Sequence, residues 1–422
     1  MKTSLFSFSK KECLAGVIGF FTTAYIIAVN SFILQEAGVP AMESLYATIL
    51  SAVIGCLLMG FYAKTPILII PGMGINALFT YTVVGQLGLS WQEALLSVVV
   101  SGAVFSLLTF TKLTGKIITL LPASLKYGMT VGLGLYIFFI GLEMGGLIVA
   151  GDSSLVRLGD LTNRDVLWTM AAFLLMLILF VRKRNGYFFI GLVVISVASF
   201  FTGDLAKPSG TYLPGWANVF AWMTDVDASV FLSSSFWIAV FTFTLVLLFE
   251  NIGLVEAHTR ASHTVDRYVP ALRGTALSTF FAGLVGSSPT VASIETQAVI
   301  QSGGKSGGSA IVTGILFIAS FFMLPLISII PTSAIAAILL IIGFFMILDI
   351  QHIPFDDVTE AFPAVFLLAT IPFTQSIIDG MAIGFLLYPI VKIGAGKWRD
   401  VNPFLAVSAF LFFVYFLLQA FV

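Results

Sequence analysis

The feature that most constrains the fold of this chain is its succession of long apolar runs. The run from Phe236 to Phe249 contains no polar residues other than two threonines. A helix needs about 20 mostly apolar residues to cross the roughly 30 Å hydrocarbon core of a bilayer. With 59% hydrophobic and 10% charged residues among 422, the chain is expected to be an all-α polytopic membrane protein. Its length accommodates about fourteen transmembrane segments and no soluble domain.

The positive charges predict how the segments are oriented. If the N-terminus lies inside and the loops alternate between the two sides, all 20 Lys and Arg residues except Arg157, Arg164 and Lys207 fall inside. This asymmetry is what the positive-inside rule expects. The sequence therefore predicts a multi-pass protein of the bacterial cytoplasmic (inner) membrane with a cytoplasmic N-terminus. The last apolar run, Phe404–Val422, leaves open whether another helix follows the fourteenth segment.

The second half of the chain echoes the first half in three places. The paired segments are Phe21–Asn30 with Thr242–Asn251, Ile69–Gly88 with Val285–Gly304, and Leu121–Ile140 with Ile330–Ile350. Seven segments, an odd number, precede the second half, so it begins from the opposite side of the membrane. Inverted repeats of this kind are typical of secondary transporters. The expected repeats are residues 12–205 (segments 1–7) and 232–422 (segments 8–14).

The middle pair of segments looks interrupted. Each follows a Pro/Gly-rich break and has about fifteen residues, from Gly74 or from Pro289 to the next turn. Short segments are tolerated at membrane depth where their free backbone groups line a cavity. We expect two half-helices whose N-terminal N–H groups face a ligand. The alternative is two kinked but complete helices.

Two carboxylic acids lie inside apolar segments, Glu250 and Glu295. A charge at the bilayer centre costs roughly 2.5–3.5 kcal/mol on insertion scales, so such residues usually face a cavity and have a function. The neighbouring basic residues, including Lys126 and Lys392, are assigned to cytoplasmic loops and offer no evident partner. An unpaired buried carboxyl takes up a proton readily, as a proton-coupled carrier requires. The alternative is a protonated glutamate that merely bonds across helices.

Several further residues are candidates for the same site. Asn30 and Asn76 lie in the matching segments of the first repeat and could bind substrate or satisfy the broken backbone. Ser293 could add to the polar lining, and Phe79 or Phe249 could stack on a ring. Asp349, beside His352 at a helix end, and Asp379, which could cap a helix, are weaker candidates.

Other functional classes lack their motifs. The "GGKS" at Gly303–Ser306 lacks the glycine that a phosphate-binding loop requires at Val299. His258, His263 and His352 do not have metal-ligand spacing, and the cysteines, Cys13 and Cys56, do not suggest a metal site. We therefore expect no enzyme, no metal and no cofactor other than a proton as coupling ion. The expected partners are a small substrate and membrane lipid, without nucleic acid.

Three stretches resemble a known family: Thr22–Leu34, Pro71–Leu95 and Ala271–Thr296. They are similar to the AzgA-like branch of the nucleobase–cation symporter-2 (nucleobase–ascorbate transporter) family. The resemblance implies a seven-plus-seven inverted fold, with a core domain (about 12–117 and 232–329) and a gate domain (about 118–205 and 330–395). It implies purine import by proton symport and alternating access, and a homodimer, which we expect to form through the gate domains.

The resemblance also assigns roles to residues. It implies that Glu250 binds the base, that Glu295 contributes to binding and coupling, and that short strands lie just before Gly74 and Thr290. Glu250 replaces the usual Asp, as in the uracil and xanthine branches, and "TQAV" (Thr296–Val299) replaces a Ser-Ala-Ala-Gly run. The choice among hypoxanthine, guanine and adenine therefore stays open. A uracil/xanthine-type symporter is the alternative, whereas two glutamates disfavour an anion transporter of this architecture.

Overall fold

The computed structural model describes residues 9–111, 122–151, 154–203, 216–327 and 329–420. Within these ranges nine helices are long and apolar enough to cross a membrane, and four shorter apolar helices accompany them. The chain is therefore a multi-pass, mostly helical membrane protein. The expected boundary near residue 118, the repeat end at 205 and Lys207 of the charge count lie outside the described residues.

The first half contains most of the helices that the apolar runs predict. Its elements are α1 (Lys10–Thr23), α2 (Tyr25–Glu36), α3 (Ala41–Leu57), η1 (Leu58–Ala63), β1 (Ile69–Pro71), α4 (Met73–Ala77), η2 (Leu78–Val84), α5 (Trp91–Phe110), α7 (Ala123–Met144), β2 (Ile148–Ala150), β3 (Val156–Leu158), α8 (Arg164–Val181) and α9 (Tyr187–Thr202). Strands β2 and β3 form a small antiparallel hairpin between α7 and α8.

The second half begins with two short 3-10 helices and continues with longer helices. Its elements are η3 (Trp216–Asp225), η4 (Ala228–Leu232), α10 (Ser234–Ala261), η5 (Val265–Arg267), α11 (Tyr268–Leu284), β4 (Thr290–Ala292), α12 (Thr296–Gln301), α13 (Gly307–Ala319), η6 (Ser320–Met323), α14 (Leu324–Ile327), α15 (Thr332–Ile347), η7 (Leu348–His352), α16 (Val358–Thr374), α17 (Ile377–Gly394), η8 (Trp398–Asp400) and α18 (Pro403–Ala420). The last apolar run thus forms α18, which packs against α17.

Local signals in the sequence explain several helix starts. Helix α5 begins with a capping box, in which the Ser90 side chain accepts from the Glu93 N–H and the Glu93 carboxylate accepts from the Ser90 N–H. Helices α7 and α15 each follow a proline, Pro122 and Pro331, at the N-cap. The shared proline supports the pairing of these two segments in the repeat comparison.

The two Pro/Gly breaks meet at the centre of the molecule. Strands β1 and β4 pair antiparallel, with Ile69 opposite Ala292 and Pro71 opposite Thr290. Gly72 lies so close to the other strand that a Cβ there would be 2.7 Å from a methyl carbon of Val291. The expected strands before two short helices are therefore confirmed, although β4 begins at Thr290 instead of ending before it. Two kinked but complete helices are ruled out by the extended backbone.

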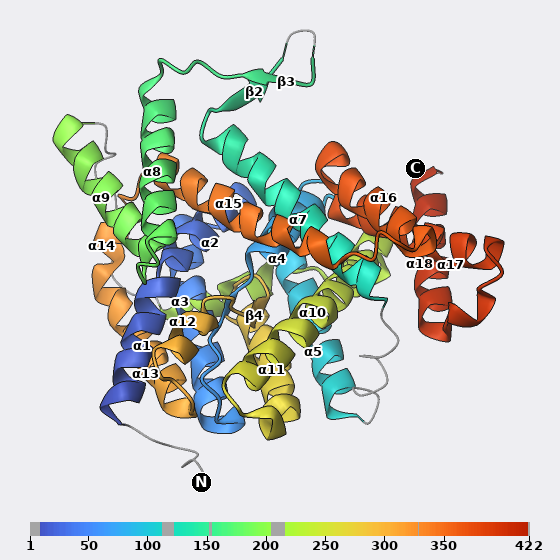
Figure 1. The fold of residues 1–422 in the computed structure, drawn as a ribbon, viewed down its shortest axis with the longest axis horizontal. Coiled ribbons are helices and arrows are strands. Elements are labelled where there is room, and N and C mark those ends of the chain that lie inside the picture. Colours follow the sequence, from blue (N-terminus) through green and yellow to red (C-terminus); the bar gives the residue numbers. More distant parts are fainter. Residues whose placement is uncertain (1–8, 112–121, 152–153, 204–215, 328, 421–422) are drawn as a thin grey trace.

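The helices pack mainly in two groups. In the first group, α5 packs on α10 and α11, and α13 packs on α1 and α3. In the second group, α7 packs on α15 and α16, while α8 packs on α9 and α15. Figure 1 shows α7 and α15 across the middle of the molecule, with α8 and α9 at one end and α16–α18 at the other. The paired strands lie among the helices of the first group.

Candidate functional site

A cavity of about 680 Å³ lies beside the paired strands β1 and β4. Its wall combines the β1–α4 turn and the β4–α12 turn with one face of α10, the start of α7 and the end of α15 with η7. The two groups of helices thus both contribute to it. A volume in this range is typical of small-molecule sites.

Helix α10 presents a narrow face to the cavity. Glu250, Gly253, Leu254 and Ala257 line it, and their spacing of three and four residues places them on one side of an α-helix. The Glu250 Oε2 atom is buried, and within the described part of the chain it has no hydrogen-bond partner. Buried polar atoms are nearly always hydrogen-bonded, so this oxygen is suited to accept from a ligand.

The neighbouring Asn251 has a different task. Its side-chain oxygen accepts a hydrogen bond of 2.9 Å from the Ala292 N–H in β4, and its amide donates to the Leu247 carbonyl. The side chain is fully buried. Two consecutive polar residues of α10 therefore have different contacts. Asn251 is hydrogen-bonded to strand β4, and Glu250 lines the cavity.

Glu295 is held by two hydroxyl groups. The Tyr25 hydroxyl donates to Oε1 at 2.5 Å, and the Ser293 hydroxyl donates to Oε2. Ser293 is itself fixed, because its backbone N–H donates to the Leu68 carbonyl at 2.9 Å. Unlike Glu250, this carboxylate is oriented by the protein before any ligand arrives.

Phe249 also lines the cavity. Its ring is 2% exposed and meets the Phe385 ring of α17 edge to face, with centroids 5.8 Å apart. The structure thus brings together four of the predicted residues, Glu250, Glu295, Ser293 and Phe249.

The other three predicted residues lie outside this cavity wall. Asn30 and Asn76 are fully buried, and their side-chain oxygens lie 3.0 and 2.5 Å from the Ser288 hydroxyl. The Asn30 amide also donates to Thr48 at 2.7 Å. Phe79 is fully buried, with its ring 6.5 Å from that of Phe243. The two amides thus contact the side chain of Ser288, just before β4, and the Asn76 amide nitrogen is buried without a hydrogen-bond partner among the described residues.

Tyr25 and Lys126 line the wall but were not among the site residues predicted from the sequence. Tyr25 lies in a matching segment of the first repeat, but its carboxylate partner is far away in the chain. Lys126 was assigned to a cytoplasmic loop, whereas the structure places it in the first turn of α7, on the cavity wall. Its ammonium nitrogen would lie 3.4 Å from a Cβ built on Gly253. The proline before α7 marks the helix start and is the signal that could have placed Lys126 in the helix.

The weaker candidates are also placed by the structure. Asp349 lies 3.5 Å from the His352 ring nitrogen, and both residues line the cavity. The His352 ring stacks on Tyr127 with centroids 5.0 Å apart. Asp379 lies away from the cavity wall: it is in the first turn of α17, where it accepts from the Tyr415 hydroxyl of α18 at 2.7 Å.

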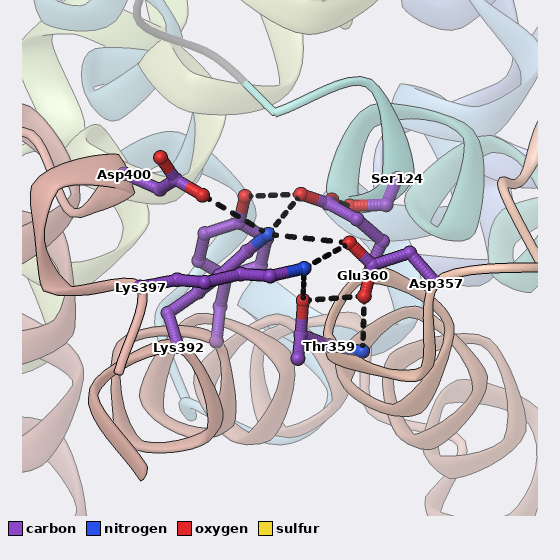
Figure 2. Close-up of polar contacts among 8 residues, drawn as sticks. Ser124, Asp357, Thr359, Glu360, Lys392, Lys397 and Asp400 are labelled. Atoms are coloured by element: carbon purple, nitrogen blue, oxygen red, sulfur yellow. Dashed lines mark hydrogen bonds and ion pairs between the residues drawn. The ribbon is translucent and has the colours of Figure 1, made fainter. Parts of the chain in front are cut away.

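A second polar cluster joins α16, α17 and η8 outside the cavity (Figure 2). Lys392 was expected in a loop, but it lies in α17, is 3% exposed and pairs with Glu360 at 2.6 Å. Glu360 also accepts from the hydroxyls of Tyr388 and Ser124. Beside it, the hydrogen bond from Lys397 holds the pKa of Asp357 well below its usual range. The same bond raises the pKa of Lys397.

The described residues contain no group of three or more His, Cys, Asp or Glu side chains that could hold a metal ion. The cavity presents hydrogen-bonding groups and charges. It can accept N–H groups at Glu250, present a fixed carboxylate at Glu295, and offer an aromatic wall at Phe249.

A comparison with solved structures shows what the fold is similar to. The chain matches the transmembrane domain of a bicarbonate transporter, BicA, from a cyanobacterium with a TM-score of 0.68. The match covers 90% of this chain and 98% of that one, at 15% sequence identity. At this identity the likeness concerns the fold alone.

Sequence comparisons are more specific. Residues 10–383 match the Permease family. The nucleobase transporter PlAzg2 of Paenibacillus larvae is 39% identical, over 90% of this chain and 77% of that protein. The guanine/hypoxanthine permease PbuO of Bacillus subtilis is 36% identical, over 96% of both chains. The chain therefore belongs to this permease family, the nucleobase–cation symporter-2 or nucleobase–ascorbate transporter family, in its AzgA-like branch.

Proposed function

We propose that this protein is a secondary active transporter that imports a purine nucleobase by proton symport. The observation that carries the proposal is the buried, unpartnered oxygen of Glu250 in the cavity. An unsatisfied buried acceptor costs about 1–3 kcal/mol, which a ligand N–H can recover. Purine bases carry ring N–H donors on a flat apolar ring, so they fit a carboxylate beside an aromatic wall.

The substrate we favour is hypoxanthine or guanine, with adenine as the next choice. PbuO, which is similar over nearly the whole chain, is named a guanine/hypoxanthine permease. The alternative is a uracil- or xanthine-type symporter, because Glu250 stands where the branch usually has Asp. A site built around one acceptor rejects strongly any analogue that lacks the matching donor.

We assign a separate role to each residue of the site. Glu250 accepts hydrogen bonds from the ring N–H groups, and Phe249 packs against the ring. Glu295, positioned by Ser293 and Tyr25, exchanges the coupled proton. Asn30, Asn76 and Phe79, which do not line the cavity, pack near the paired strands β1 and β4 and support them. The proton is the coupling ion, and no cofactor takes part.

The architecture we propose is a seven-plus-seven inverted repeat, residues 12–205 and 232–422. The antiparallel pairing of β1 with β4, one strand from each half, supports it. So do the two groups of helices, which we assign to a core domain (about 12–117 and 232–329) and a gate domain (about 118–205 and 330–395). Helix α18 then follows the fourteenth segment. A homodimer through the gate domains is part of the proposal and is testable by cross-linking.

The structure corresponds, in this proposal, to an inward-facing state. The charged and exposed part of the cavity wall, including Lys126 and His352, lies at helix ends that the positive-inside rule places in the cytoplasm. The proposed core and gate domains are in contact beyond the far end of the cavity. There Gln86 donates to the Gln375 carbonyl at 2.9 Å, and the Ile377 N–H lies 3.4 Å from the Thr82 hydroxyl. Import would proceed by rocking of the core against the gate about the binding site.

A competition experiment tests the proposal. Purified protein is incubated with labelled hypoxanthine and with unlabelled guanine, adenine, xanthine, uracil or bicarbonate. We expect saturable binding that guanine displaces and bicarbonate does not. Displacement by uracil or xanthine alone would replace the proposal with its alternative, and displacement by bicarbonate would indicate an anion transporter.

A further inference from the structure

Two of the acidic groups on the cavity wall have partners among the described residues. Glu295 accepts from Tyr25 and Ser293, and Asp349 lies 3.5 Å from His352. Two further groups lie on the wall. Glu250 has an oxygen without a hydrogen-bond partner among the described residues, and Lys126 is, of the described lining residues, the one with a permanent positive charge.

The geometry brings these two groups to the same part of the wall. The Lys126 ammonium nitrogen would be 3.4 Å from a Cβ on Gly253. Gly253 lies three residues after Glu250, which is about 4.5 Å along a helix axis and on the same face. The ammonium group thus lies beside the α10 backbone at Gly253.

We propose that Lys126 is the counter-cation of Glu250 and keeps its carboxyl group ionised. The inference rests on the proposed function, in which Glu250 must be an acceptor for ring N–H groups. A protonated carboxyl would lose part of that capacity, because one oxygen then carries a hydrogen. In this proposal, a cation on α7 keeps the acceptor on α10 ionised. It also makes substrate binding depend on the position of the second group of helices, to which α7 belongs.

Other groups around the pair define the competing explanation. Lys126 also acts electrostatically on Asp349, and its ammonium lies 4.5 Å from the Tyr127 ring. Tyr25, Tyr187, Glu295 and His352 are the remaining titratable groups on the wall. If Lys126 only anchors the start of α7 to Asp349 and Tyr127, its loss would weaken binding equally at every pH.

The first test measures hypoxanthine affinity from about pH 6 to about pH 9 in the wild type, Lys126→Gln and Lys126→Arg. We expect Lys126→Gln to bind about tenfold more weakly near pH 7, with recovery as the pH rises and Glu250 ionises. Lys126→Arg keeps the charge and should retain wild-type affinity. Lys126→Gln should have no further effect in a Glu250→Gln background. The exposed Lys10→Gln serves as the control and should not change the pH profile.

The second test needs no substrate, so it separates this inference from the proposed function. Infrared spectra across the same pH range report the carbonyl band of protonated carboxylic acids, and the Glu250 contribution is identified by its absence in Glu250→Gln. We expect this band near pH 7 in Lys126→Gln but not in the wild type or Lys126→Arg. Identical Glu250 titration in the wild type and Lys126→Gln would overturn the inference, whatever the protein transports. Wild-type protein that binds no nucleobase would instead contradict the proposed function.

Discussion

The Tyr25 hydroxyl donates a hydrogen bond of 2.5 Å to the carboxylate of Glu295, across a separation of 270 residues. The bond joins α2 in the first half of the chain to the turn before α12 in the second half. Together with the Ser293 hydroxyl, it fixes the direction in which Glu295 faces the cavity. In the proposed transporter, the residue that exchanges the proton is therefore positioned by both halves.

Removal of this donor should impair coupling. In Tyr25→Phe the ring and its packing on Phe188 remain, while one oxygen of Glu295 loses its partner. A hydrogen bond to a charged group contributes about 1.5–3 kcal/mol, so proton-driven accumulation should fall about tenfold or more. Uptake with and without a proton gradient is the measurement. The control Tyr62→Phe alters an exposed ring off the cavity wall, and gradient-driven accumulation in Tyr25→Phe equal to that control would contradict the role.

Glu250→Gln should abolish or greatly weaken nucleobase binding while the protein stays folded. The amide is nearly isosteric, but its nitrogen cannot accept an N–H group. Glu256→Gln is the matched control, since Glu256 is on the same helix and pairs with exposed Arg260 at 2.7 Å. Equilibrium binding and size-exclusion profiles of both variants are the measurements. Equal affinity in the two variants would remove Glu250 from the site.

Asn251→Leu should destabilise the centre of the protein. The change leaves the Ala292 N–H of β4 buried without its acceptor, which costs about 1–3 kcal/mol. We expect a lower melting temperature and weaker substrate binding, because β4 leads into the turn that carries Glu295. Thermal unfolding followed by intrinsic fluorescence measures the loss. An unchanged melting temperature would show that β4 is held by its pairing with β1 alone.

The polar cluster of Figure 2 provides a test with two lysines that differ in burial. Lys392 is 3% exposed and its partner Glu360 is 20% exposed. Lys392→Met leaves that carboxylate without its cation, although the hydroxyls of Tyr388 and Ser124 still donate to it. The change should cost about 2–3 kcal/mol, somewhat less than for a fully buried pair. Lys397, which pairs with Asp357 at 2.7 Å at the surface, should give a much smaller loss as Lys397→Met. Equal losses of stability would mean that burial does not set the strength of this cluster.

The surface pair in that cluster predicts a pH dependence. Because the pKa of Asp357 is lowered in the folded protein, its stabilising effect is present above the unfolded pKa and is lost as the pH falls through the folded one. Because the pKa of Lys397 is raised, its effect is present below the unfolded pKa and is lost as the pH rises through the folded one. The melting-temperature difference between wild type and Lys397→Met should thus be constant around neutral pH and disappear in strong acid. A difference that grows on acidification would contradict this sign.

Part of the fold could be predicted from local chemistry. Many apolar runs such as Phe236–Phe249, with few charges between them, indicate helices within a bilayer, and the Pro71–Gly72 break disfavours a continuous helix. The extended strand β1 lies at this break, as the family resemblance implied. Glu250 was selected for a related reason, because a carboxyl group in an apolar run is costly and usually has a function.

The features that could not be predicted depend on contacts between segments that are distant in the sequence. An amide that binds a ligand and one that supports a broken backbone look alike in sequence, so Asn30 and Asn76 could not be assigned before Ser288 was placed beside them. Tyr25 finds its partner in the other half of the chain. Counting charges assigned Lys126 to a side of the membrane, but its direction toward Gly253 depends on how α7 packs on α10.

Uptake of labelled hypoxanthine into proteoliposomes with an inward proton gradient tests the central claim most directly. The account predicts accumulation above equilibrium in the wild type, prevented by excess guanine or by collapse of the gradient, and absent in Glu250→Gln. Uptake that is independent of the gradient, or that purines do not compete with, would contradict purine–proton symport by this protein.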